Sequence, residues 1–580
     1  MPASNIITLD NLSEQLPPWR SDDDNHLNGI RFSITSLAPP TTRLLLPVYS
    51  TRAAISLFDA LTASSSGLVF PPATIESVSC ALSQFHQLAI VHGVPPAHIM
   101  ILATEAVRRA ANAAQMLDAI GQATGGLGVH ILDPSVETLF GAVMGSRSGL
   151  VDVDGGALFL DLGGGSVQMT WVDTGSDRYE IDAAMAGESL PYGAAKLTRV
   201  LEEQPAQVQQ METGALKVGV QRIYANLCSK FPTLQAIKAA HEKGDDAAVD
   251  VYMCGGGFRG YGSMLMHNDA IKPYPISSIS TYSVPGPLFR QTDKMRRVNQ
   301  GYNGKIVGLS KRRRRQFPAI ATVVEALIAA VPNIGRVTFC GGSNRQGALM
   351  MKLPLEIRES NPLDVVANVT QQEQPIFDNV LHLLSTALPK EMRSKIPIFN
   401  LKLGALFVRQ IWHRQGYESD ANASFALHDA ITRNSDCPGL THLARAILGL
   451  AVCARWGCGI GPADAELYLG LRRIADSHTG GSSFWATCIG ALSSVIATVF
   501  PMMPKEPHHL SRAVRFDTKI KAGNKGKRGK VVLTIGLASE YANSVNAESL
   551  ADDFQATMTT MNNKRYRSPW KVLVRVTTLS

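Results

Sequence analysis

The sequence lacks the marks of several classes of protein. Its eight cysteines are scattered through 580 residues without a C-x-x-C pair, which argues against a zinc site or a disulfide framework and favours reduced thiols in a cytoplasmic protein. No basic start followed by an apolar run opens the chain, so we expect no secretory signal. The stretch 484–500 is uncharged but diluted by Ser, Thr and Gly, which predicts a buried helix rather than a membrane span.

Charged residues are also scarce, at 18% of the chain against 45% hydrophobic residues, and the net charge is only +8. This composition excludes a disordered or collagen-like chain. The small positive excess favours anionic ligands such as phosphates, but it does not indicate nucleic-acid binding. A chain of 580 residues is longer than the roughly 250–300 residues that one hydrophobic core supports, so we expect several domains.

The order of strand-like and helix-like segments predicts an α/β protein. Residues 28–155 alternate the two, with strands expected at 29–35, 43–50, 98–104 and 128–132 and helices at 73–91 and 106–120, as in a sheet flanked by helices. Over 156–355 a strand ending in a glycine turn recurs three times, in ALFLDLGGGS, VYMCGGGFRG and VTFCGGSNRQG. Ala/Leu-rich helices dominate 356–505, including 375–388, 439–456 and 462–476. Three further strands are expected within 506–580, and residues 1–27 are expected to be irregular.

The most specific of the glycine turns is D-L-G-G-G-S, from Asp161 to Ser166. It lies between two strand-like runs, which predicts a hairpin rather than the strand-to-helix turn of a P-loop. Gly163, Gly164 and Gly165 allow the backbone N–H groups to converge on a phosphate. Asp161 can hold a cation or an attacking water, and Ser166 adds a hydroxyl donor. The other two turns are as consistent with plain turns, but their similar contexts favour three loops that line one cleft.

These motifs resemble those of a known family. D-L-G-G-G-S-V-Q from Asp161, A-T-E-A-V-R ending at Arg108 and C-G-G-S-N-R-Q-G from Cys340 are similar to motifs of the exopolyphosphatase and guanosine pentaphosphatase (Ppx/GppA) family. Other segments, such as S-L-P-Y-G-A-A from Ser189, resemble a fungal branch that signals mitochondrial state to the nucleus. The resemblance covers roughly 28–475. It implies a two-lobed ATPase fold, as in actin, Hsp70 and hexokinase, with lobes over 28–155 and 156–355, then a mainly α-helical domain over 356–505 and a small α/β unit over 506–580.

The resemblance also implies roles for single residues. Glu137, in D-P-S-V-E-T, takes the place of the family's general base, and an ordinary helix-start glutamate is the alternative. Arg108 corresponds to a phosphate ligand, with a surface arginine as the alternative. The implied second phosphate loop consists of Asp161, Gly163, Gly164, Gly165 and Ser166.

The first phosphate loop departs from the family pattern. In D24-N-H-L-N-G-I-R31, Asp24, Asn28 and Arg31 align, but His26 and Leu27 replace a glycine and a serine. These changes remove backbone freedom and a hydroxyl donor, and the preceding residues do not form the apolar strand that should present the loop. Either the site is degraded, or residues 1–27 come from a misplaced exon boundary, which the abrupt return to family sequence favours. In both cases we expect weak or no hydrolysis.

Two functions are consistent with this pattern. The first is a cytoplasmic regulator in which a polyphosphate or purine nucleotide favours lobe closure and so changes the docking of a signalling protein. The second is a hydrolase of terminal phosphoanhydrides, with Glu137 as base and Mg²⁺ held by Asp161 and Asp24. Neither requires a membrane or direct nucleic-acid binding. The basic run K311-R-R-R-R315 is interpreted as a solvated helix face or an anion-attracting rim rather than a nuclear-import signal.

Overall fold

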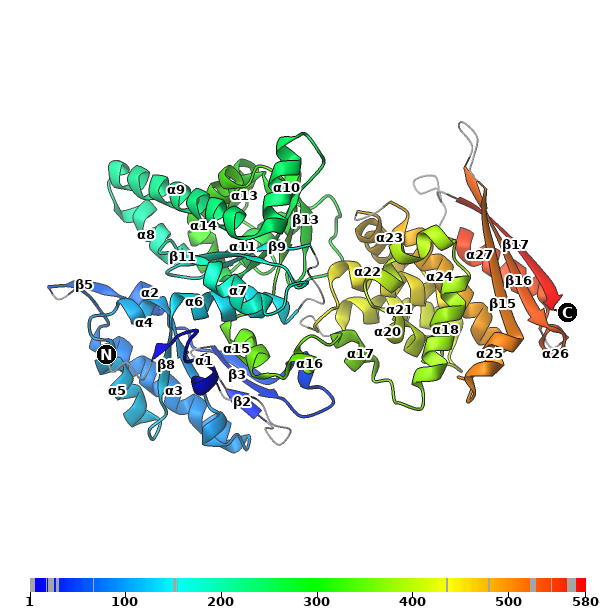
Figure 1. Cartoon of the computed structure of the whole chain (residues 1–580), viewed down its shortest axis with the longest axis horizontal. Coiled ribbons are helices and arrows are strands. Elements are labelled where there is room, and N and C mark those ends of the chain that lie inside the picture. Colours follow the sequence, from blue (N-terminus) through cyan, green and yellow to red (C-terminus); the bar gives the residue numbers. More distant parts are fainter. Residues whose placement is uncertain are drawn as a thin grey trace. The chain divides into compact units, whose positions relative to one another are not determined.

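The computed structural model describes residues 6–16, 18, 25–27, 31–65, 67–149, 153, 155–433, 437–477, 480–521, 528–543, 545–560 and 570–579. The chain forms two compact units, whose elements are labelled in Figure 1. Unit 1 comprises Met1–Asn268 and Ser278–Ser360, and unit 2 comprises Asp269–Ser277 and Asn361–Ser580. The chain therefore enters unit 2 briefly before it returns to finish unit 1.

The first lobe of unit 1 contains two three-stranded sheets and a small hairpin. One sheet is parallel, in the order β1 (Ile6–Ile7), β8 (Val129–Leu132), β7 (Ile101–Ala103). The other is antiparallel, in the order β2 (Asn25–Leu27), β3 (Arg31–Ser36), β4 (Pro47–Arg52). The remaining elements of the lobe are η2 (Thr42–Leu44), α1 (Leu12–Gln15), α2 (Leu57–Ala60), β5 (Thr62–Ser64), β6 (Gly67–Val69), α3 (Pro72–Val91), η3 (Pro96–His98), α4 (Glu105–Arg109), α5 (Ala113–Ala123), α6 (Pro134–Glu137) and the π-helix η4 (Thr138–Gly145).

Three predictions for this lobe need correction. Residues 1–27 are not wholly irregular, because Ile6–Ile7 joins the parallel sheet and Ile7 is fully buried. The strand expected over 43–50 begins only at Pro47, since Leu45 adopts a left-handed conformation after η2. The helix expected over 106–120 breaks into α4 and α5, because the side chain of Asn112 exchanges hydrogen bonds of 2.8 and 2.9 Å with the backbone of Phe70 and fixes a turn there.

The second lobe is built on one six-stranded sheet. Its order is β11 (Glu188–Leu190), β10 (Val167–Val172), β9 (Ala157–Leu162), β12 (Val249–Cys254), β14 (Ile334–Phe339), β13 (Ser283–Pro285). Strands β9, β12 and β14 are parallel, while β10 folds back on β9 as the predicted hairpin. The other two glycine runs are strand-to-helix junctions instead of turns, since α11 begins at Gly255 and α15 at Asn344.

Helices complete unit 1. Those of the second lobe are α7 (Tyr179–Ala186), α8 (Ala194–Glu203), α9 (Ala206–Lys230), α10 (Pro232–Glu242), α11 (Gly255–His267), α12 (Gly286–Phe289), α13 (Thr292–Gly301) and α14 (Lys311–Ala330). The chain then returns to the first lobe, where α15 (Asn344–Lys352) packs on η4 and α16 (Leu355–Arg358) contacts η2. In Figure 1 the green α15 and α16 lie beside the blue and cyan first lobe. This return places the start of α15 where the two lobes meet.

Unit 2 is mainly helical and ends in a small sheet. Its helices are α17 (Pro362–Ala367), α18 (Gln374–Thr386), η5 (Lys390–Lys395), α19 (Pro397–Asn400), α20 (Gly404–Ile411), α21 (Ser419–Thr432), α22 (His442–Arg455), α23 (Pro462–Asp476), α24 (Ser482–Val499), α25 (Pro507–Ala513), α26 (Ser539–Ala542) and α27 (Ala547–Thr559). Among the described residues only α24 is long and apolar enough to cross a membrane, and 89% of it is buried within the fold. As predicted, it is a core helix.

The sheet of unit 2 has the order β15 (Val514–Lys521), β16 (Gly529–Ala538), β17 (Trp570–Leu579). Strands β15 and β16 are antiparallel, and β16 and β17 are parallel. The predicted basic loop between β15 and β16 lies mostly outside the described residues. The observed fold is thus the predicted one: two α/β lobes, a mainly α-helical domain and a small α/β unit.

Candidate functional site

The carboxylate of Asp161 lies where four chain segments meet near the end of β9. A Cβ atom added to Gly141 of η4 would lie 2.5 Å from its Oδ2, and one added to Gly255 of α11 would lie 2.1 Å from its Oδ1. These two glycines therefore provide the space that the carboxylate occupies. Oδ1 is buried without a hydrogen-bond partner. Burial raises the pKa of Asp161, while Arg259, the neighbouring thiol of Cys254 and then Arg31 oppose the rise.

The loop after Asp161 is held in place by its own turn and by the first turn of α8. The N–H of Gly163 donates to the carbonyl of Ser166 at 3.0 Å and closes the turn. The carbonyls of Gly163 and Gly164 accept hydrogen bonds of 3.0 and 2.9 Å from Ala194 and Ala195, in the first turn of α8. The loop carbonyls thus satisfy N–H groups that a helix start would otherwise leave without a partner.

Three amides of this loop have no recorded backbone partner. Within the described part of the chain, no backbone hydrogen bond is recorded for the N–H groups of Gly164, Gly165 or Ser166. The Ser166 side chain is buried and accepts a bond of 2.8 Å from Gln168, so it contributes to the sheet interior. The first lobe crowds the loop, because a Cβ at Gly165 would lie 2.9 Å from Cγ of Glu105. The loop can therefore offer a backbone donor to an anion chiefly at Gly164, which is exposed, whereas Gly165 and Ser166 are buried.

Glu137 is a buried carboxylate at the junction of α6 and η4. Helix α6 begins at Pro134 because Asp133 caps it: the Asp133 side chain accepts a hydrogen bond of 2.9 Å from the N–H of Ser135. Proline is also favoured at the first position of a helix. Glu137 is only 6% exposed. Burial raises its pKa to about 7, against the lowering effect of Arg108. A carboxylate with this pKa is suited to accept a proton near neutral pH.

Arg108 is committed to this carboxylate. Its Nη2 donates to Oε2 of Glu137 at 2.6 Å and to Oε2 of Glu105 at 2.9 Å, and its Nη1 donates to the carbonyl of Leu132. The guanidinium is mostly buried, with 16% of the side chain exposed. The arrangement makes Arg108 the partner of Glu137, and its role as a phosphate ligand stays a prediction.

Six arginines interact electrostatically with one another beside Asp161, on which two of them, Arg31 and Arg259, act directly, and we call the six the arginine cluster. Its members come from both lobes and from α15: Arg31, Arg52, Arg259, Arg312, Arg313 and Arg345. A Cβ at Gly256 would lie 3.6 Å from Nη2 of Arg313 and 3.9 Å from Nη2 of Arg31. Burial, and then Arg259 and other members, lower the pKa of Arg313 to about 10. Arg31 keeps an exposed side chain, yet burial of its head group and then Arg259 lower its pKa too.

Arg345, in the first turn of α15, has hydrogen-bond donors that no protein group satisfies. Its Nε and Nη1 are buried and have no hydrogen-bond partner. Burial, followed by repulsion from Arg31 and Arg259, lowers its pKa to about 10. Arg259 itself is anchored, with its Nη1 donating to the carbonyls of Gly341 and Gly342 at 3.2 and 3.1 Å. A buried, unpaired guanidinium among like charges is a position that an anion would stabilise.

The basic run at 311–315 opens α14, as predicted, with Ser310 as its cap. Its arginines separate into different contacts. Arg312 pairs with Asp59 of α2 at 3.0 Å, across the two lobes, while Arg315 pairs with Glu202 at 2.6 Å within the second lobe. Only Arg312 and Arg313 belong to the arginine cluster, so the run supplies both lobe-to-lobe pairing and local positive charge.

The predicted first loop is only partly described. Asp24 and Asn28 lie outside the described residues. His26 and Leu27 lie in β2, paired with Thr35 and Ile34 of β3, and Arg31 begins β3. Sequence reasoning missed Arg259, Asn344 and Arg345, although each follows a glycine run, in GGGFRG and GGSNRQG.

The donor set fits Mg²⁺ only if phosphate oxygens complete it. Oδ1 of Asp161 and Oδ1 of Asn344 are both buried without partners. A Cβ atom added to Gly141 would lie 2.5 Å from Oδ2 of Asp161 and 2.6 Å from Oδ1 of Asn344, so the two side chains converge there. Among the described residues no three His, Cys, Asp or Glu side chains converge as a metal site. Mg²⁺ is often held by one or two protein oxygens plus ligand phosphates, which is what these residues allow.

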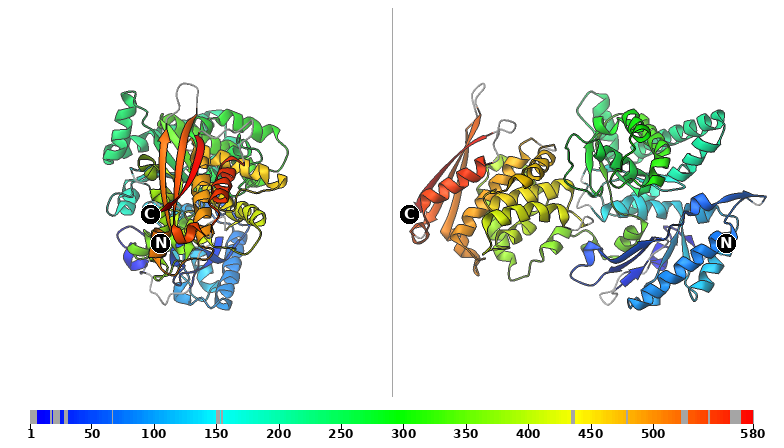
Figure 2. Two further views of the ribbon diagram at one scale, coloured as in Figure 1. Left: turned by 90° about the vertical axis from the view of Figure 1, so that its right-hand side faces the viewer. Right: turned by 180° about the vertical axis from the view of Figure 1, so that it is seen from behind.

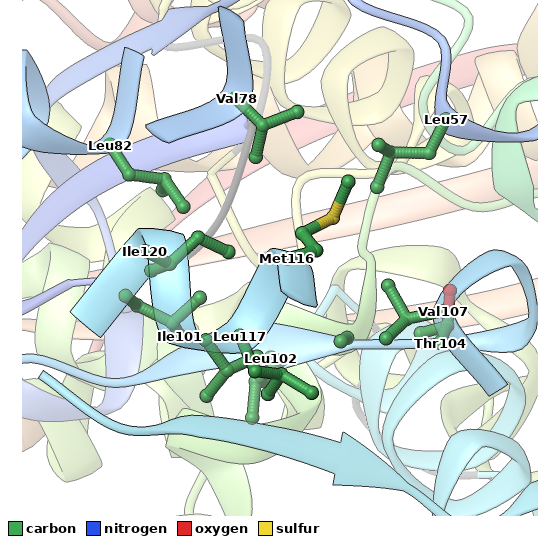
Figure 3. Close-up of a pocket in the computed structure, with 12 residues that line it drawn as sticks. Leu57, Val78, Leu82, Ile101, Leu102, Thr104, Val107, Met116, Leu117 and Ile120 are labelled. Carbon is green, nitrogen blue, oxygen red and sulfur yellow. The ribbon is translucent and has the colours of Figure 1, made fainter. Parts of the chain in front are cut away.

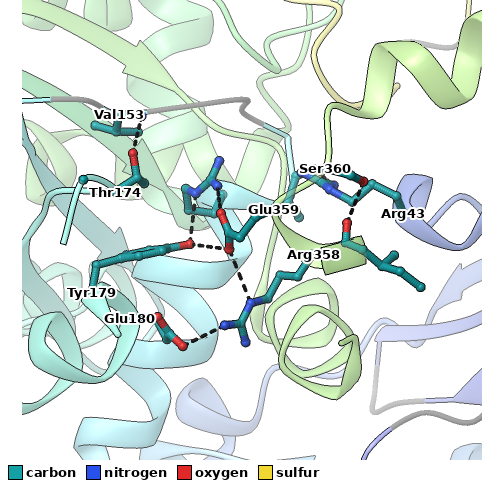
Figure 4. Close-up of polar contacts among 12 residues, drawn as sticks. Arg43, Val153, Thr174, Tyr179, Glu180, Arg358, Glu359 and Ser360 are labelled. Atoms are coloured by element: carbon teal, nitrogen blue, oxygen red, sulfur yellow. Dashed lines mark hydrogen bonds and ion pairs between the residues drawn. The ribbon is translucent and has the colours of Figure 1, made fainter. Parts of the chain in front are cut away.

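A buried ionic network lies elsewhere at the meeting of the lobes (Figure 4). Glu359 accepts from Nη2 of Arg147 at 2.5 Å and from the hydroxyl of Tyr179 at 3.0 Å, and Arg358 pairs with Glu180 at 2.8 Å. Arg147 is 1% exposed. Through this network, the segment after η4 is held against α7 and α16.

A separate cavity of about 130 Å³ lies behind α4 (Figure 3). Its lining is apolar apart from Thr104, so it has no means of binding phosphate. The lining residues are Leu57, Val78, Leu82, Ile101, Leu102, Ala103, Thr104, Val107, Met116, Leu117, Ile120 and Val129.

Comparisons with known proteins identify the family of the chain. Residues 39–356 match the model of the Ppx/GppA phosphatase family, and residues 361–579 match the RTG2 C-terminal domain. Retrograde regulation protein 2 of Saccharomyces cerevisiae is 31% identical over 492 residues, covering 82% of this chain and 79% of that protein.

Solved structures of similar proteins cover a little over half of the chain. A Ppx/GppA phosphatase of Aquifex aeolicus is 16% identical with a TM-score of 0.40, covering 57% of this chain and 99% of its own. An exopolyphosphatase of Cytophaga hutchinsonii is 17% identical with a TM-score of 0.41, covering 57% of this chain and 97% of its own. From the family match and the 31% identity, the chain belongs to the Ppx/GppA phosphatase family and continues into an RTG2 C-terminal domain.

Proposed function

We propose that this protein is a regulator resembling Retrograde regulation protein 2, and that it binds a phosphate polyanion at the arginine cluster with weak or no phosphatase activity. The observation that carries the proposal is the unpaired guanidinium of Arg345 beside Arg31 and Arg259. Such a group costs free energy until an anion pairs with it. A polyphosphate or a purine nucleotide supplies several negative charges in one molecule, which matches a cluster of several arginines.

Two features support weak hydrolysis. Three of the five N–H groups of Arg108 are engaged by Glu105, Glu137 and a backbone carbonyl, which reduces the number of donors that it can offer to a reacting phosphoryl group. The first loop carries His26 and Leu27 in place of a glycine and a serine, which lowers its number of hydrogen-bond donors. Catalysis of phosphoryl transfer depends almost entirely on such positioning and charge stabilisation.

A working phosphohydrolase is the second candidate, and one observation favours it. Glu137 is only 6% exposed and has a pKa of about 7, which is what a general base for an attacking water requires. Asp161 and Asn344 would help to hold Mg²⁺ on the ligand phosphates, and the ion would neutralise phosphate charge.

The first experiment measures ligand binding. Isothermal titration with polyphosphate, ATP and guanosine pentaphosphate, each with and without Mg²⁺, is compared between the wild-type protein and Arg345→Met. Arg297→Met is the matched control, since Arg297 is an exposed arginine of α13 outside the cluster. We expect Arg345→Met alone to weaken binding at least tenfold, the equivalent of about 1.4 kcal/mol. Equal loss in both variants, or none in either, would contradict an anion site at the cluster.

The second experiment separates the two candidates. Phosphate release from polyphosphate and guanosine pentaphosphate is measured for the wild-type protein and for Glu137→Gln, which keeps the shape of the side chain but cannot accept a proton. A regulator gives no release above background in either protein. Release that Glu137→Gln abolishes, with ligand binding intact, would establish the hydrolase instead.

The proposal includes a protein partner and a cellular location. A retrograde regulator acts through a protein partner, and we place this one in the cytoplasm, in line with eight free cysteines of which seven are buried. Ligand binding would favour one arrangement of the lobes, and the Glu359 network next to the end of unit 1 is positioned to respond to it. Fractionation of cells that express a tagged full-length chain tests the location directly.

A further inference from the structure

The sheet of unit 2 has two chemically different faces. On β15, β16 and β17 alternate side chains point to opposite faces, and one set is buried in the core of unit 2. This inner set comprises Val514, Phe516, Val531, Leu533, Ile535, Leu537 and Val572. Figure 1 shows helices α24, α25 and α27 on one side of the three strands, and the left view of Figure 2 looks onto the other side. That second side, which we call the outer face, is open.

Strand register places three lysines side by side on the outer face. Lys521 of β15 pairs with Lys530 of β16, and Lys530 pairs with Lys571 of β17. Cβ atoms at directly opposed positions lie about 5 Å apart, and like charges there destabilise a sheet. No ion pair is recorded for any of these three lysines within the described residues, and each is exposed. Repulsion among the three lysines therefore destabilises the sheet, and nothing in the packing of the sheet requires lysine at these exposed positions.

The positive charge continues over the rest of the outer face. Arg575 and Arg515 lie on the same face, two and three rows from the lysines. Asp517 is the sole acidic residue that register assigns to the outer face of the described strands, and it lies 3.9 Å from Lys519. By sequence, the segments 518–538 and 560–579 contain no Asp or Glu at all. A polybasic surface of this kind attracts an anionic partner.

The residues at the centre of the outer face indicate which kind of anionic partner would fit it. The row next to the lysines pairs Lys519 with Val532 and Leu573, and Leu573 is 37% exposed. Register puts no aromatic residue on the outer face of the described strands, and Trp570 belongs to the inner set of positions. Single-stranded nucleic acid is bound largely by stacking on aromatic side chains, which this face does not offer. Alternating charge and apolar surface is instead complementary to an acidic segment of a protein.

We propose that the outer face of the β15–β16–β17 sheet is the docking surface for an acidic, partly apolar segment of a partner protein. Lys521, Lys530 and Lys571 would pair with its carboxylates, and Val532 and Leu573 would contact its apolar side chains. The surface lies wholly within unit 2 and does not depend on the anion site of unit 1.

The test uses the full-length protein and a fluorescent peptide that alternates glutamate with valine, with binding measured by anisotropy. The key variant is Lys530→Glu, which places a carboxylate between two lysines. We expect peptide affinity to fall about tenfold and the loss to shrink at high salt, because exposed charges are screened. The thermal midpoint should stay equal or rise, since the substitution removes like-charge contacts. Lys505→Glu, at an exposed lysine of unit 2 outside the sheet, is the matched control and should bind like the wild type.

Further arms separate this surface from the anion site and from other partners. Arg345→Met should leave peptide binding unchanged, and Lys530→Glu should leave polyphosphate binding to the arginine cluster unchanged. Peptide affinity that Lys530→Glu does not alter would overturn the proposal and leave the lysines as a means of keeping the sheet from pairing with another copy. Tighter binding of duplex DNA, polyphosphate or phosphatidylserine vesicles than of the peptide, lost in Lys530→Glu, would also overturn it.

Discussion

Removing the charge of Arg345 should make the ligand-free protein more stable. Burial and then Arg31 and Arg259 lower the pKa of Arg345 from 12.5 to about 10. One pKa unit corresponds to about 1.4 kcal/mol, so the charged side chain costs the folded state about 3 kcal/mol at any pH well below 10. Arg345→Met keeps an apolar stem of similar length, and the lost Nε and Nη1 have no protein partner to leave unsatisfied. We expect a gain of about 1–3 kcal/mol, since relaxation reduces the full cost.

The assay is differential scanning calorimetry, with and without polyphosphate. Because two units can unfold separately, the relevant transition is the one that polyphosphate shifts in the wild-type protein. For a unit of this size a gain of about 1–3 kcal/mol corresponds to a rise of about 1–4 °C in its Tm, and polyphosphate should raise the Tm of the variant less than that of the wild-type protein. A variant that is less stable than the wild type and still responds fully to polyphosphate would refute the reasoning.

Three further perturbations test the surroundings of the site. Burial raises the pKa of Glu137 from 4.5 to about 7, so its stabilising contribution is complete below pH 4.5 and is lost as the pH rises to about 7; Glu137→Gln should flatten that part of the stability curve measured by urea unfolding. Gly255→Ala places a Cβ 2.1 Å from Asp161 at a φ of +83° and should cost more than about 2 kcal/mol and weaken polyphosphate binding, whereas Gly244→Ala, at a φ of +92° in open space, should cost only about 1–2 kcal/mol and leave binding intact. Leu82→Ala, which enlarges the apolar cavity behind α4, should cost about 2–5 kcal/mol in chemical denaturation without changing anion affinity.

Local sequence was enough to predict those helices and strands whose start, end and apolar pattern depend only on their own residues. The hairpin around Asp161 is an example, because two apolar strands flank a run of glycines. Helix α23 was predicted at its observed bounds, since Pro462 marks its start and its apolar residues recur at helical spacing. Breaks were harder to predict. The turn between α4 and α5 depends on Asn112 reaching Phe70, far away in sequence, and propensity alone favours a continuous Ala-rich helix there.

The candidate site was predictable only in part, for a similar reason. A motif identifies Asp161, Glu137 and Arg108 as chemically relevant, and the structure places all three in buried surroundings. What each side chain contacts depends on residues brought together by the tertiary fold. The pairing of Arg108 with Glu137 spans two helices, and the convergence of Arg259 and Arg345 on Arg31 joins segments from both ends of unit 1.

The interleaved chain path limits how the protein can be divided. Asp269–Ser277 belongs to unit 2 although the chain on either side of it belongs to unit 1. Within that short stretch Ile276 is 2% exposed in the core of unit 2, and the hydroxyl of Tyr274 lies 2.8 Å from Nδ1 of His442. A fragment ending at Ser360 would carry this stretch without its core, and one beginning at Asn361 would lack it. Truncation at the apparent boundary therefore damages both halves, and loss of function in such fragments is no measure of what either half does in the intact protein.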